Sequence, residues 1–386
     1  MKNTKVAIFT GTRAEYGLLY WLINDVKRDK ALTLQLLVSG SHLSPEFGLT
    51  YKQILDDGFD IAEKIEMLLS SDSPVGTVKS MGLAVVGYAD ALDRLSPDVI
   101  VILGDRYEAL AVAQTAMIMR IPIIHLHGGE ISEGAYDDAI RHAITKLSYL
   151  HATSTDIYRQ RVIQLGEAPE RVVNVGAIGL DHLKRTTLLS RDELAHALEF
   201  DLSKPYFIVT YHPVTLAEEP PIDTFTSLLR ALDNFPSHQV IITYPNADDG
   251  GREIIPLLTS YGSDRPGRVS AIPSLGQIRY LSAVKYADAV IGNSSSGIIE
   301  VPSFDVPTVN LGLRQKGRLA AKSVLHCAAT EDGILEAIEL AVSRKYKQKN
   351  EEISNPYSKG DASSRIIEMI KSFKFSSMKV FHDLEV

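Results

Sequence analysis

The sequence predicts an α/β protein built from two doubly wound, Rossmann-like domains. Short apolar runs of about 4–7 residues alternate with segments of helical periodicity, which is typical of βα units and a parallel sheet. At 386 residues the chain is long for a single core. A polar stretch over 181–204 divides the apolar runs into two sets. We therefore expect domains over 1–182 and 200–358, with a C-terminal helix over 361–376 that joins the first domain.

The expected elements follow from these runs. Each predicted strand is an apolar run bounded by polar or glycine-containing turns. In the first half the strands lie at 6–10, 33–38, 99–103, 121–125, 151–153 and 172–175. In the second half they lie at 207–211, 240–244, 269–272, 289–291, 308–311 and 324–327. Helical periodicity predicts helices over 15–27, 77–95, 107–120, 137–147, 222–234, 275–286, 333–343 and 362–373.

Composition excludes several classes of protein. The net charge of −8 argues against nucleic acid as a partner, because a phosphate backbone binds a basic face. The single cysteine, Cys327, excludes a disulfide framework and a cysteine-rich zinc site. The longest apolar stretch, 109–126, is interrupted by Arg120 and Pro122, so it does not suit a membrane span. We expect a cytoplasmic protein without a membrane segment.

The first predicted strand ends in a glycine turn, Thr10-Gly11-Thr12-Arg13. A glycine there lets the backbone approach an anion, and Arg13 could clamp a phosphate. The alternative is a solvated turn arginine. The turn is not the dinucleotide fingerprint, and no acid follows the second strand to bind a ribose, so a nicotinamide enzyme is not expected.

A serine-rich turn, Gly292-Asn293-Ser294-Ser295-Ser296-Gly297, opens a predicted helix in the second half. Backbone amides and hydroxyls in such a turn suit a diphosphate, and a helix N-terminus adds positive partial charge. Glu300, one turn further on, could accept hydrogen bonds from ribose hydroxyls. The alternatives are an ordinary serine-capped helix and an exposed glutamate.

The segment from 104 to 146 carries acids and bases just after predicted strands, where an open α/β sheet binds its ligand. Carboxylates gathered there are costly unless paired, so they favour a functional site. Helix capping is the alternative, above all for the first of them. The candidates are Asp105, Glu130, Asp137 and Asp138, with Arg106 and Arg141 as charge partners.

Histidines and further polar residues follow other strands. His125 and His127 lie two apart, but no third ligand stands at a metal-site spacing, so we expect no metal. Residues that end strands are expected to line the cleft between the domains, with ordinary loop residues as the alternative. These are His42, His212, Asn246 and Arg314.

Seven motifs in order resemble the hydrolysing UDP-N-acetylglucosamine 2-epimerases of bacterial sialic-acid and legionaminic-acid synthesis. They are G-T-R-A-E-Y, G-S-H-L, G-D-R-Y-E, H-G-G-E, D-D-A-I-R-H-A-I-T-K, Y-H-P-V-T and G-N-S-S-S-G-I-I-E. The likeness runs from about residue 5 to about residue 330. It implies a fold like that of the GT-B glycosyltransferases, with the active site in the interdomain cleft and UDP held mainly by the second domain.

The resemblance also implies roles for residues. Ser294, Ser295 and Arg13 would bind the diphosphate and Glu300 the ribose, with Ser296 and Gly297 in the same turn. His212 and Arg314 match positions near the phosphates, while Asp105, Arg106, Asp137 and Asp138 match positions near the sugar. Other branches of the family carry a catalytic glutamate where this chain has His127. The nearest carboxylate is Glu130, so either residue could take that role.

The reaction that the resemblance implies is elimination of UDP to a glycal, followed by addition of water, without a cofactor. The substrate would be UDP-N-acetylglucosamine, which gives N-acetylmannosamine. The same reaction on UDP-2,4-diacetamido-2,4,6-trideoxyglucose, a non-hydrolysing epimerase and a GT-B glycosyltransferase are the alternatives. A non-catalytic sensor is disfavoured, because clustered carboxylates would not help to bind an anion. A homodimer or homotetramer is expected at the level of the family.

Overall fold

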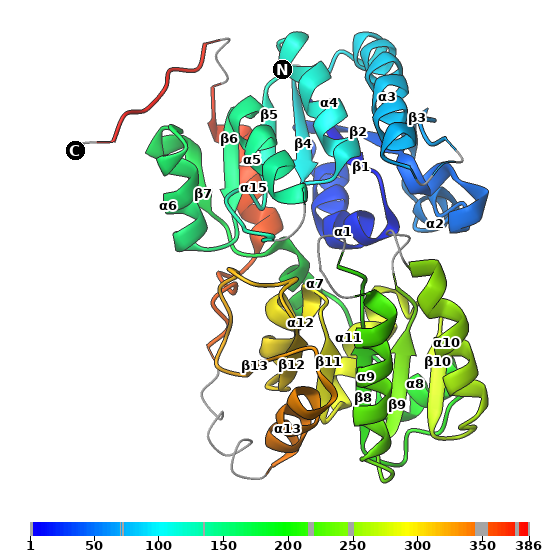
Figure 1. Cartoon of the computed structure of the whole chain (residues 1–386). Coiled ribbons are helices and arrows are strands. Elements are labelled where there is room, and N and C mark those ends of the chain that lie inside the picture. The colour runs from blue at the N-terminus through cyan, green and yellow to red at the C-terminus, as the bar shows by residue number, and fades with distance from the viewer. Residues whose placement is uncertain are drawn as a thin grey trace. The chain divides into compact units, whose positions relative to one another are not determined.

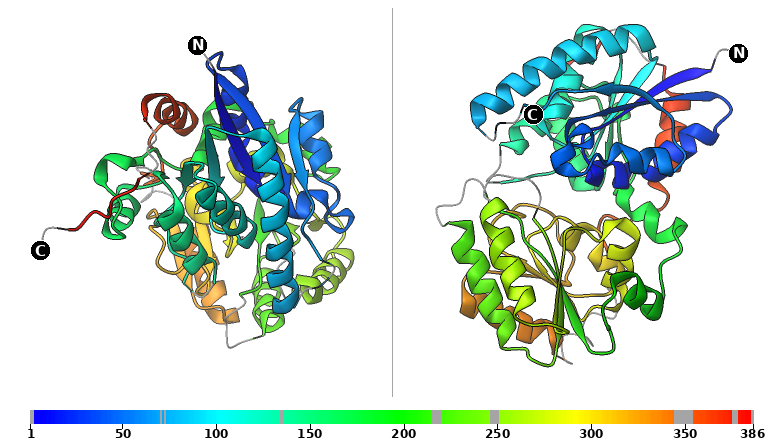
Figure 2. Two further views of the ribbon diagram at one scale, coloured as in Figure 1. Left: turned by 90° about the horizontal axis from the view of Figure 1, so that it is seen from above. Right: turned by 90° about the vertical axis from the view of Figure 1, so that its right-hand side faces the viewer.

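The computed structural model describes residues 3–69, 71, 73–133, 136–214, 220–245, 251–343, 354–374 and 378–384. It divides into two compact domains (Figure 1). The first comprises Met1–Glu130, Tyr136–His182 and Lys359–Val386, and the second comprises Ile131–Ala135 and Leu183–Ser358. Each domain is an open sheet with helices on both faces (Figure 2), which confirms the predicted fold class.

The first sheet holds the strands β1 Thr4–Thr10, β2 Leu32–Ser39, β3 Ile61–Ile65, β4 Val99–Leu103, β5 Ile123–Leu126, β6 Leu150–Thr153 and β7 Val172–Asn174. The second sheet holds β8 Tyr206–Thr210, β9 Gln239–Thr243, β10 Val269–Ile272, β11 Ala289–Gly292, β12 Thr308–Leu311 and β13 Val324–Cys327. All pairings in both sheets are parallel.

The helices of the first domain are α1 Arg13–Arg28, α2 Tyr51–Asp56, α3 Pro74–Leu95, α4 Tyr107–Ile118, α5 Asp137–Leu147, α6 Asp156–Gln164 and α15 Ala362–Ser372. The short helix α7, Asp181–Arg185, lies where the chain passes to the second domain. The second domain has α8 Arg191–Leu198, α9 Pro221–Asp233, α10 Gly251–Ser263, α11 Gly276–Tyr286, α12 Ser296–Ile299 and α13 Glu331–Val342.

Both sheets have a point at which the strand order reverses. The first runs β3-β2-β1-β4-β5-β6-β7 and the second runs β10-β9-β8-β11-β12-β13. The reversal therefore falls between β1 and β4 in one domain and between β8 and β11 in the other. Crevices at the carboxyl ends of such strand pairs are the usual ligand sites of doubly wound folds.

Alternate residues of the first sheet face two separate cores. Val6 and Ile8 of β1 pack with α1 and α15, through residues such as Leu19 and Ile366. The intervening side chains of β1 pack with α3 and α4 on the opposite face. The alternation follows from the two-residue period of a strand. The C-terminal helix is therefore part of the first domain's core, about 350 residues after the helix beside it.

The second sheet is covered in the same way. Phe207 and Val209 of β8 pack against α9, α10 and α13. Tyr206 and Ile208 face α8, α11 and the turn that contains Val301. The helix α8 lies in the stretch that the sequence suggested as a polar link. Its Leu194 is fully buried, and Ser190 caps it in a capping box with Glu193.

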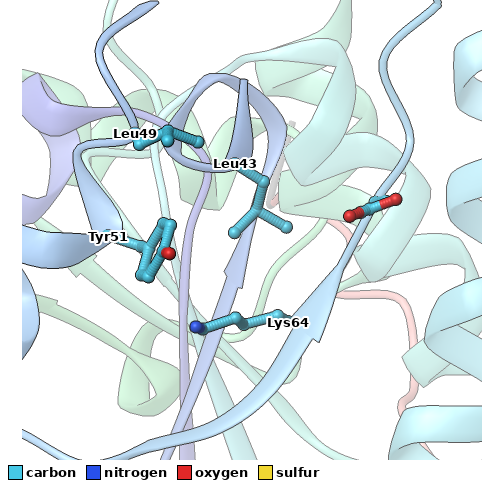
Figure 3. A pocket seen from close by; sticks show the side chains of 5 residues that line it. Leu43, Leu49, Tyr51 and Lys64 are labelled. Carbon is cyan, nitrogen blue, oxygen red and sulfur yellow. The ribbon is translucent and has the colours of Figure 1, made fainter. Parts of the chain in front are cut away.

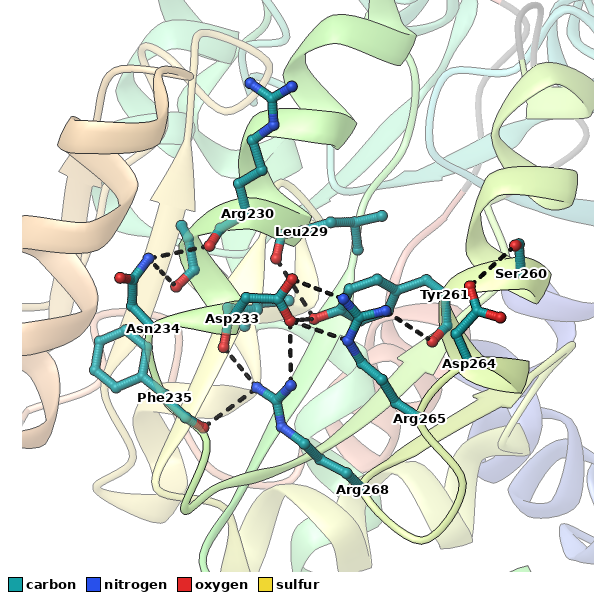
Figure 4. A network of polar contacts seen from close by, with 12 residues as sticks. Leu229, Arg230, Asp233, Asn234, Phe235, Ser260, Tyr261, Asp264, Arg265 and Arg268 are labelled. Carbon is teal, nitrogen blue, oxygen red and sulfur yellow. Dashed lines mark hydrogen bonds and ion pairs between the residues drawn. The ribbon is translucent and has the colours of Figure 1, made fainter.

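An ion-pair cluster stabilises the second domain at the amino ends of β9 and β10. The reversal-point crevice lies at the opposite, carboxyl ends of the strands. Asp233, at the end of α9, accepts hydrogen bonds from Tyr261 at 2.9 Å, Arg265 at 2.8 and 3.0 Å, and Arg268 at 3.1 Å (Figure 4). Arg268 also donates to the carbonyl of Leu232 at 2.7 Å. The cluster joins α9, α10 and the turn before β10.

Two differences from the expected elements stand out. The strand β3 was not predicted, because Ile61–Ile65 contains two charged residues and no continuous apolar run. It lies at the edge of the sheet, where such residues can face water. The helices α2, α6, α7, α8 and α10 were also not predicted, whereas α12 is the helix expected at the serine turn. No helix in the described ranges is long and apolar enough to cross a membrane.

Candidate active site

The reversal point of the first sheet brings the turn after β1 next to the turn after β4. Thr12 caps α1 and forms a capping box with Glu15, so the helix begins at Arg13. The exposed Arg13 is thus the first residue of α1, and the turn after β4 carries Asp105 and Arg106. Three predicted site residues therefore lie at the carboxyl edge of the first sheet, where the strand order reverses.

Two buried glutamates lie behind this edge. Glu15 accepts from the amides of Gly11 at 2.7 Å and Thr12 at 3.2 Å. Glu108, only 1% exposed, accepts two hydrogen bonds of 3.2 Å from the Arg106 guanidinium. Burial raises the pKa of Glu15 to about 7, with Arg106 lowering it and the neighbouring Glu108 raising it. Arg106 is consequently oriented by a carboxylate that the sequence analysis did not single out.

Asp105 pairs with Arg141 of α5. The Arg141 side chain is 3% exposed, whereas that of Asp105 is 22% exposed. Asp105 is thus held in place by a buried arginine and is partly exposed, which is the arrangement expected of a general base that must reach a ligand. The structure thus brings together two residues that the sequence places 36 positions apart.

His127 and Glu130 form a hydrogen-bonded pair within the first domain. His127 has a φ of +63°, and its Nε2 accepts from the amide of Ile178 at 3.3 Å. Its Nδ1 therefore carries the proton and donates to Glu130 at 2.9 Å. The same Glu130 oxygen accepts from Ser154 at 2.7 Å, and the residue is 2% exposed. Both ring nitrogens of His127 are engaged, so its ring orients the Glu130 carboxylate.

Two other histidines in this part of the fold are buried. His42 contacts the hydroxyls of Thr10 at 3.0 Å and Thr50 at 2.8 Å, and burial lowers its pKa to about 4. His125 donates to the carbonyl of Gly104 at 2.8 Å, and burial lowers its pKa to about 3. His42 stays a predicted site residue, although in this structure its ring is held by two threonines.

The remaining predicted residues of the first domain lie in the first turn of α5. Asp137 and Asp138 are half-buried at its N-terminus, where a negative charge is favourable. Asp138 lies 3.4 Å from His142 one turn on. Arg141 follows on the same helix and links it to Asp105.

The reversal point of the second sheet depends on a glycine. Gly292 ends β11 with a φ of +141°, and a side chain there would collide with the carbonyl of Thr210 at the end of β8. The close approach places the turn after β11 directly beside the turn after β8. Asn293 follows Gly292 directly, and His212 lies two residues after Thr210.

Asn293 connects two of the predicted phosphate-binding residues, His212 and Arg314, through hydrogen bonds. Its side-chain amide accepts from the backbone amide of His212 and donates to the His212 carbonyl, both at 2.7 Å. Its own carbonyl accepts from Arg314 at 3.0 Å and from Gln315 at 2.9 Å. Burial, with Arg314 nearby, lowers the pKa of His212 to about 3, so its imidazole is neutral.

The serine turn follows Asn293. The amide of Ser296 donates to the Ser294 hydroxyl at 3.4 Å, and Gly297 packs against Thr308, which donates to its carbonyl at 2.7 Å. The helix that follows, α12, has only four residues, so its dipole is smaller than the sequence suggested. Ser295 and Glu300 flank this helix, and Asn246 lies outside the described residues.

The first domain also has a hollow that lies apart from these residues. It is lined by Leu43, Leu49, Tyr51, Lys64 and Glu66, beside the ends of β2 and β3 (Figure 3). The Lys64 ammonium stands 3.8 Å from the centre of the Tyr51 ring. None of the predicted site residues lines it. Within the described part of the chain, no group of three or more His, Cys, Asp or Glu side chains is placed to hold a metal ion.

Comparison with known proteins identifies the family. The model of the family described as UDP-N-acetylglucosamine 2-epimerase matches residues 24–371. A "GDP/UDP-N,N'-diacetylbacillosamine 2-epimerase (hydrolyzing)" from Campylobacter jejuni is 42% identical, over 90% of each chain. A "UDP-N-acetylglucosamine 2-epimerase" from Neisseria meningitidis serogroup B is 31% identical over 99% of this chain and 100% of its own. The chain belongs to the UDP-N-acetylglucosamine 2-epimerase family.

A solved structure supports the fold of this epimerase. A UDP-GlcNAc 2-epimerase from Neisseria meningitidis, in a crystal structure with UDP-GlcNAc, matches with a TM-score of 0.81. It covers 96% of this chain and 100% of its own, at 18% sequence identity. The family resemblance seen in the motifs is therefore confirmed, and the protein is a UDP-sugar 2-epimerase.

Several polar residues around the epimerase's predicted site were missed by sequence reasoning. Glu15 could have been found, because it stands three residues after Thr12 in a capping-box pattern. Glu108 pairs with Arg106 two residues before it and was quoted within its motif without a role. Ser154 acts through a longer-range contact with Glu130 that no spacing reveals. Asn293 was quoted within its motif without a role. No sequence pattern around Gln315 indicates its hydrogen bond to Asn293.

Proposed function

We propose that the protein is a hydrolysing 2-epimerase that converts a UDP-2-acetamido sugar and water into UDP and the free 2-epimer. The observation that carries this proposal is the arrangement around Asn293, which holds His212 and Arg314 beside the serine turn of the second domain. A neutral imidazole, a guanidinium and the hydroxyls of the serine turn together suit a leaving diphosphate. Residues of the first domain would act on the sugar of the same substrate.

The first half of the reaction is an elimination. The bond between C1 and the phosphate oxygen breaks, and its electron pair leaves with UDP. A base takes the proton from C2, and the remaining pair forms the double bond of a glycal. Arg13, His212, Arg314 and the Ser294–Ser296 turn would stabilise the leaving diphosphate. Asp105 is our choice of base, because its carboxylate is partly open and is held by Arg141.

The second half adds water to the glycal. The water oxygen bonds to C1, and an acid delivers a proton to C2 on the face opposite the one that lost it. The net change is one water consumed, one UDP released and one inverted centre. Glu130 and Asp137 are the candidate partners of Asp105. Glu130 is favoured over His127, because the ring nitrogens of His127 are engaged by Glu130 and Ile178.

Two substrates fit this chemistry. We place UDP-N,N'-diacetylbacillosamine first, which is UDP-2,4-diacetamido-2,4,6-trideoxyglucose. The 42% identical relative is named a GDP/UDP-N,N'-diacetylbacillosamine 2-epimerase, and a 34% identical relative from Legionella pneumophila a UDP-N,N'-diacetylbacillosamine 2-epimerase. UDP-N-acetylglucosamine is the second candidate, because the 31% identical relative bears that one. The two sugars differ at C4 and C6. We propose that the product serves synthesis of a sialic-acid-type nonulosonate in the cytoplasm and that the enzyme is a homo-oligomer.

The test is incubation with each UDP-sugar alone, in D₂O, followed by NMR. We expect UDP, a free 2-epimerised sugar and deuterium at C2. A non-hydrolysing epimerase would return a UDP-linked epimer, and a glycosyltransferase without an acceptor would be nearly inert. Product without deuterium at C2 would exclude elimination. Comparison of kcat/KM for the two sugars assigns the substrate.

A further inference from the structure

A short segment after Glu130 belongs to the second domain, although its neighbours in sequence belong to the first. The segment is Ile131–Ala135, and the first domain resumes at Tyr136. It follows Glu130 directly, and the helix that begins at Asp137 comes just after it. The described part of the segment, residues 131–133, is therefore joined directly to the candidate acid–base residue Glu130. Contacts that hold these residues also constrain the position of Glu130.

The turn at 313–318 of the second domain holds this segment. Arg318 Nε donates to the carbonyl of Ile131 at 3.2 Å, and its Nη2 lies 3.5 Å from the Ser132 hydroxyl. Lys316 Nζ lies 3.4 Å from a Glu133 carboxylate oxygen. The Lys316 and Glu133 side chains are 61% and 48% exposed, so this ion pair contributes little. The half-buried Arg318 is the main link.

A glycine allows the close approach. Gly317 has a φ of +84°, and a side chain there would stand 2.9 Å from Glu133 Oε1 and 3.0 Å from Ile131 Cγ2. The backbone of the turn thus lies directly against the segment. Any other residue at this position would strain the left-handed backbone, and its side chain would force Glu133 or Ile131 to move.

The same turn contacts the predicted diphosphate site at its other end. Arg314 and Gln315 donate to the carbonyl of Asn293, and Gln315 is 3% exposed. Two backbone hydrogen bonds make the turn compact, from Lys316 to Leu313 at 2.9 Å and from Arg318 to Gln315 at 3.2 Å. A shift of Arg314 toward a ligand would therefore be transmitted to Arg318.

We propose that Arg318 is a positioning residue that holds Ile131 and Ser132, directly after Glu130, against the turn that carries Arg314. The inference rests on the proposed function. In this role it acts through the Ile131 carbonyl and Ser132 and not by contact with UDP or the sugar, so occupation of the diphosphate site and placement of Glu130 are coupled.

The test compares full-length Arg318→Ala, Arg318→Lys and the control Arg230→Ala, which removes an exposed arginine of the same domain. The readouts are kcat and KM for the UDP-sugar, the affinity for UDP by calorimetry, and the share of free glycal among the products. For Arg318→Ala we expect kcat to fall by roughly 10- to 100-fold, because a displaced catalytic group costs about that much. UDP affinity should stay within threefold of the wild type. The share of glycal should rise, because the group that protonates C2 when water adds to the glycal is displaced.

Arg318→Lys retains one donor and should recover part of kcat, whereas Arg230→Ala should match the wild type. A kcat of Arg318→Ala within twofold of the wild type overturns the inference. So does a loss of UDP affinity in proportion to kcat, because Arg318 would then serve nucleotide binding. If Arg318→Ala does not fold, Arg318→Lys decides: a 3- to 10-fold fall in kcat with unchanged UDP affinity supports the inference, and no fall refutes it. Wild-type protein that turns over neither UDP-sugar would instead refute the proposed function.

Discussion

The side chain of Asn293 holds both backbone polar groups of His212, accepting from its amide and donating to its carbonyl, each at 2.7 Å. The two residues follow β11 and β8, the neighbouring strands on either side of the reversal point of the second sheet. The position of the imidazole therefore depends on an amide in a different motif. The carbonyl of the same asparagine receives Arg314 and Gln315, so one residue organises the turn after β8 and the loop after β12.

Asn293→Asp should weaken UDP binding. The carboxylate still accepts from the His212 amide, but its second oxygen faces the His212 carbonyl, with which it cannot form a hydrogen bond. A buried group left without its partner costs about 1–3 kcal/mol, which corresponds to roughly 5- to 150-fold in affinity. Calorimetry with UDP measures the effect, with the exposed Asn234→Asp as control. Unchanged affinity in a folded Asn293→Asp protein would contradict the role given to Asn293.

Asp105→Asn should abolish most turnover and leave UDP binding intact. The amide keeps the size of the side chain but cannot take the C2 proton, so kcat should fall by roughly 10²- to 10⁴-fold. UDP affinity by calorimetry should be that of the wild type, because Asp105 belongs to the sugar side of the proposed site. The exposed Asp60→Asn serves as control. Near-normal kcat would remove Asp105 from the mechanism.

His127→Asn and His127→Ala form a matched pair. Asparagine tolerates the left-handed backbone at this position, and its Nδ2 can replace the imidazole Nδ1 as donor to Glu130. His127→Ala loses a hydrogen bond to a carboxylate, which is worth about 1.5–3 kcal/mol. We expect kcat to fall roughly 10-fold or more in the alanine variant and much less in the asparagine variant. Equal loss in both would show that the imidazole itself takes part in the chemistry.

Glu15 should make stability fall with rising pH. Burial raises its folded pKa to about 7 from an ordinary 4.5, with Arg106 lowering it and Glu108 raising it. The folded state thus binds more protons than the unfolded state between these values. Its stabilising effect is full below pH 4.5 and is lost as the pH rises to about 7, by up to roughly 3 kcal/mol.

Glu15→Gln keeps an acceptor oxygen for Gly11 but cannot ionise. The unfolding free energy of this variant, relative to the wild type, should therefore rise between pH 5 and pH 8. Urea denaturation at the two pH values measures both proteins. A constant difference between them would mean that Glu15 ionises in the folded protein much as it does in the unfolded chain.

The sequence predicted the central features of the fold well, because buried parallel strands are continuous apolar runs. β4, β10 and β12 lie at the predicted residues. The edge strand β3 escaped, since charged residues interrupt its pattern. The helix α8 escaped because only one of its residues, Leu194, is buried.

Residues of the candidate site were predictable where a motif placed chemistry at the end of a strand, as at Asp105 and His212. Their supporting residues were not. Ser154 and Gln315 act through hydrogen bonds that depend on how distant segments fold together. The sequence likewise could not tell whether His127 or Glu130 takes the catalytic role. The hydrogen bond between them depends on the left-handed turn at His127, which no motif predicts.

The return of α15 to the first domain has a consequence for how the protein is made. Asp181 accepts from the amides of Ala362 and Ser363, and Ile366 fills the same core as Val6. A chain still on the ribosome has synthesised nearly all of the first domain long before these residues emerge. The N-terminal half must therefore wait with one sheet face covered by α1 but not by α15, and a premature stop near residue 360 would leave the first domain unfinished rather than merely shortened.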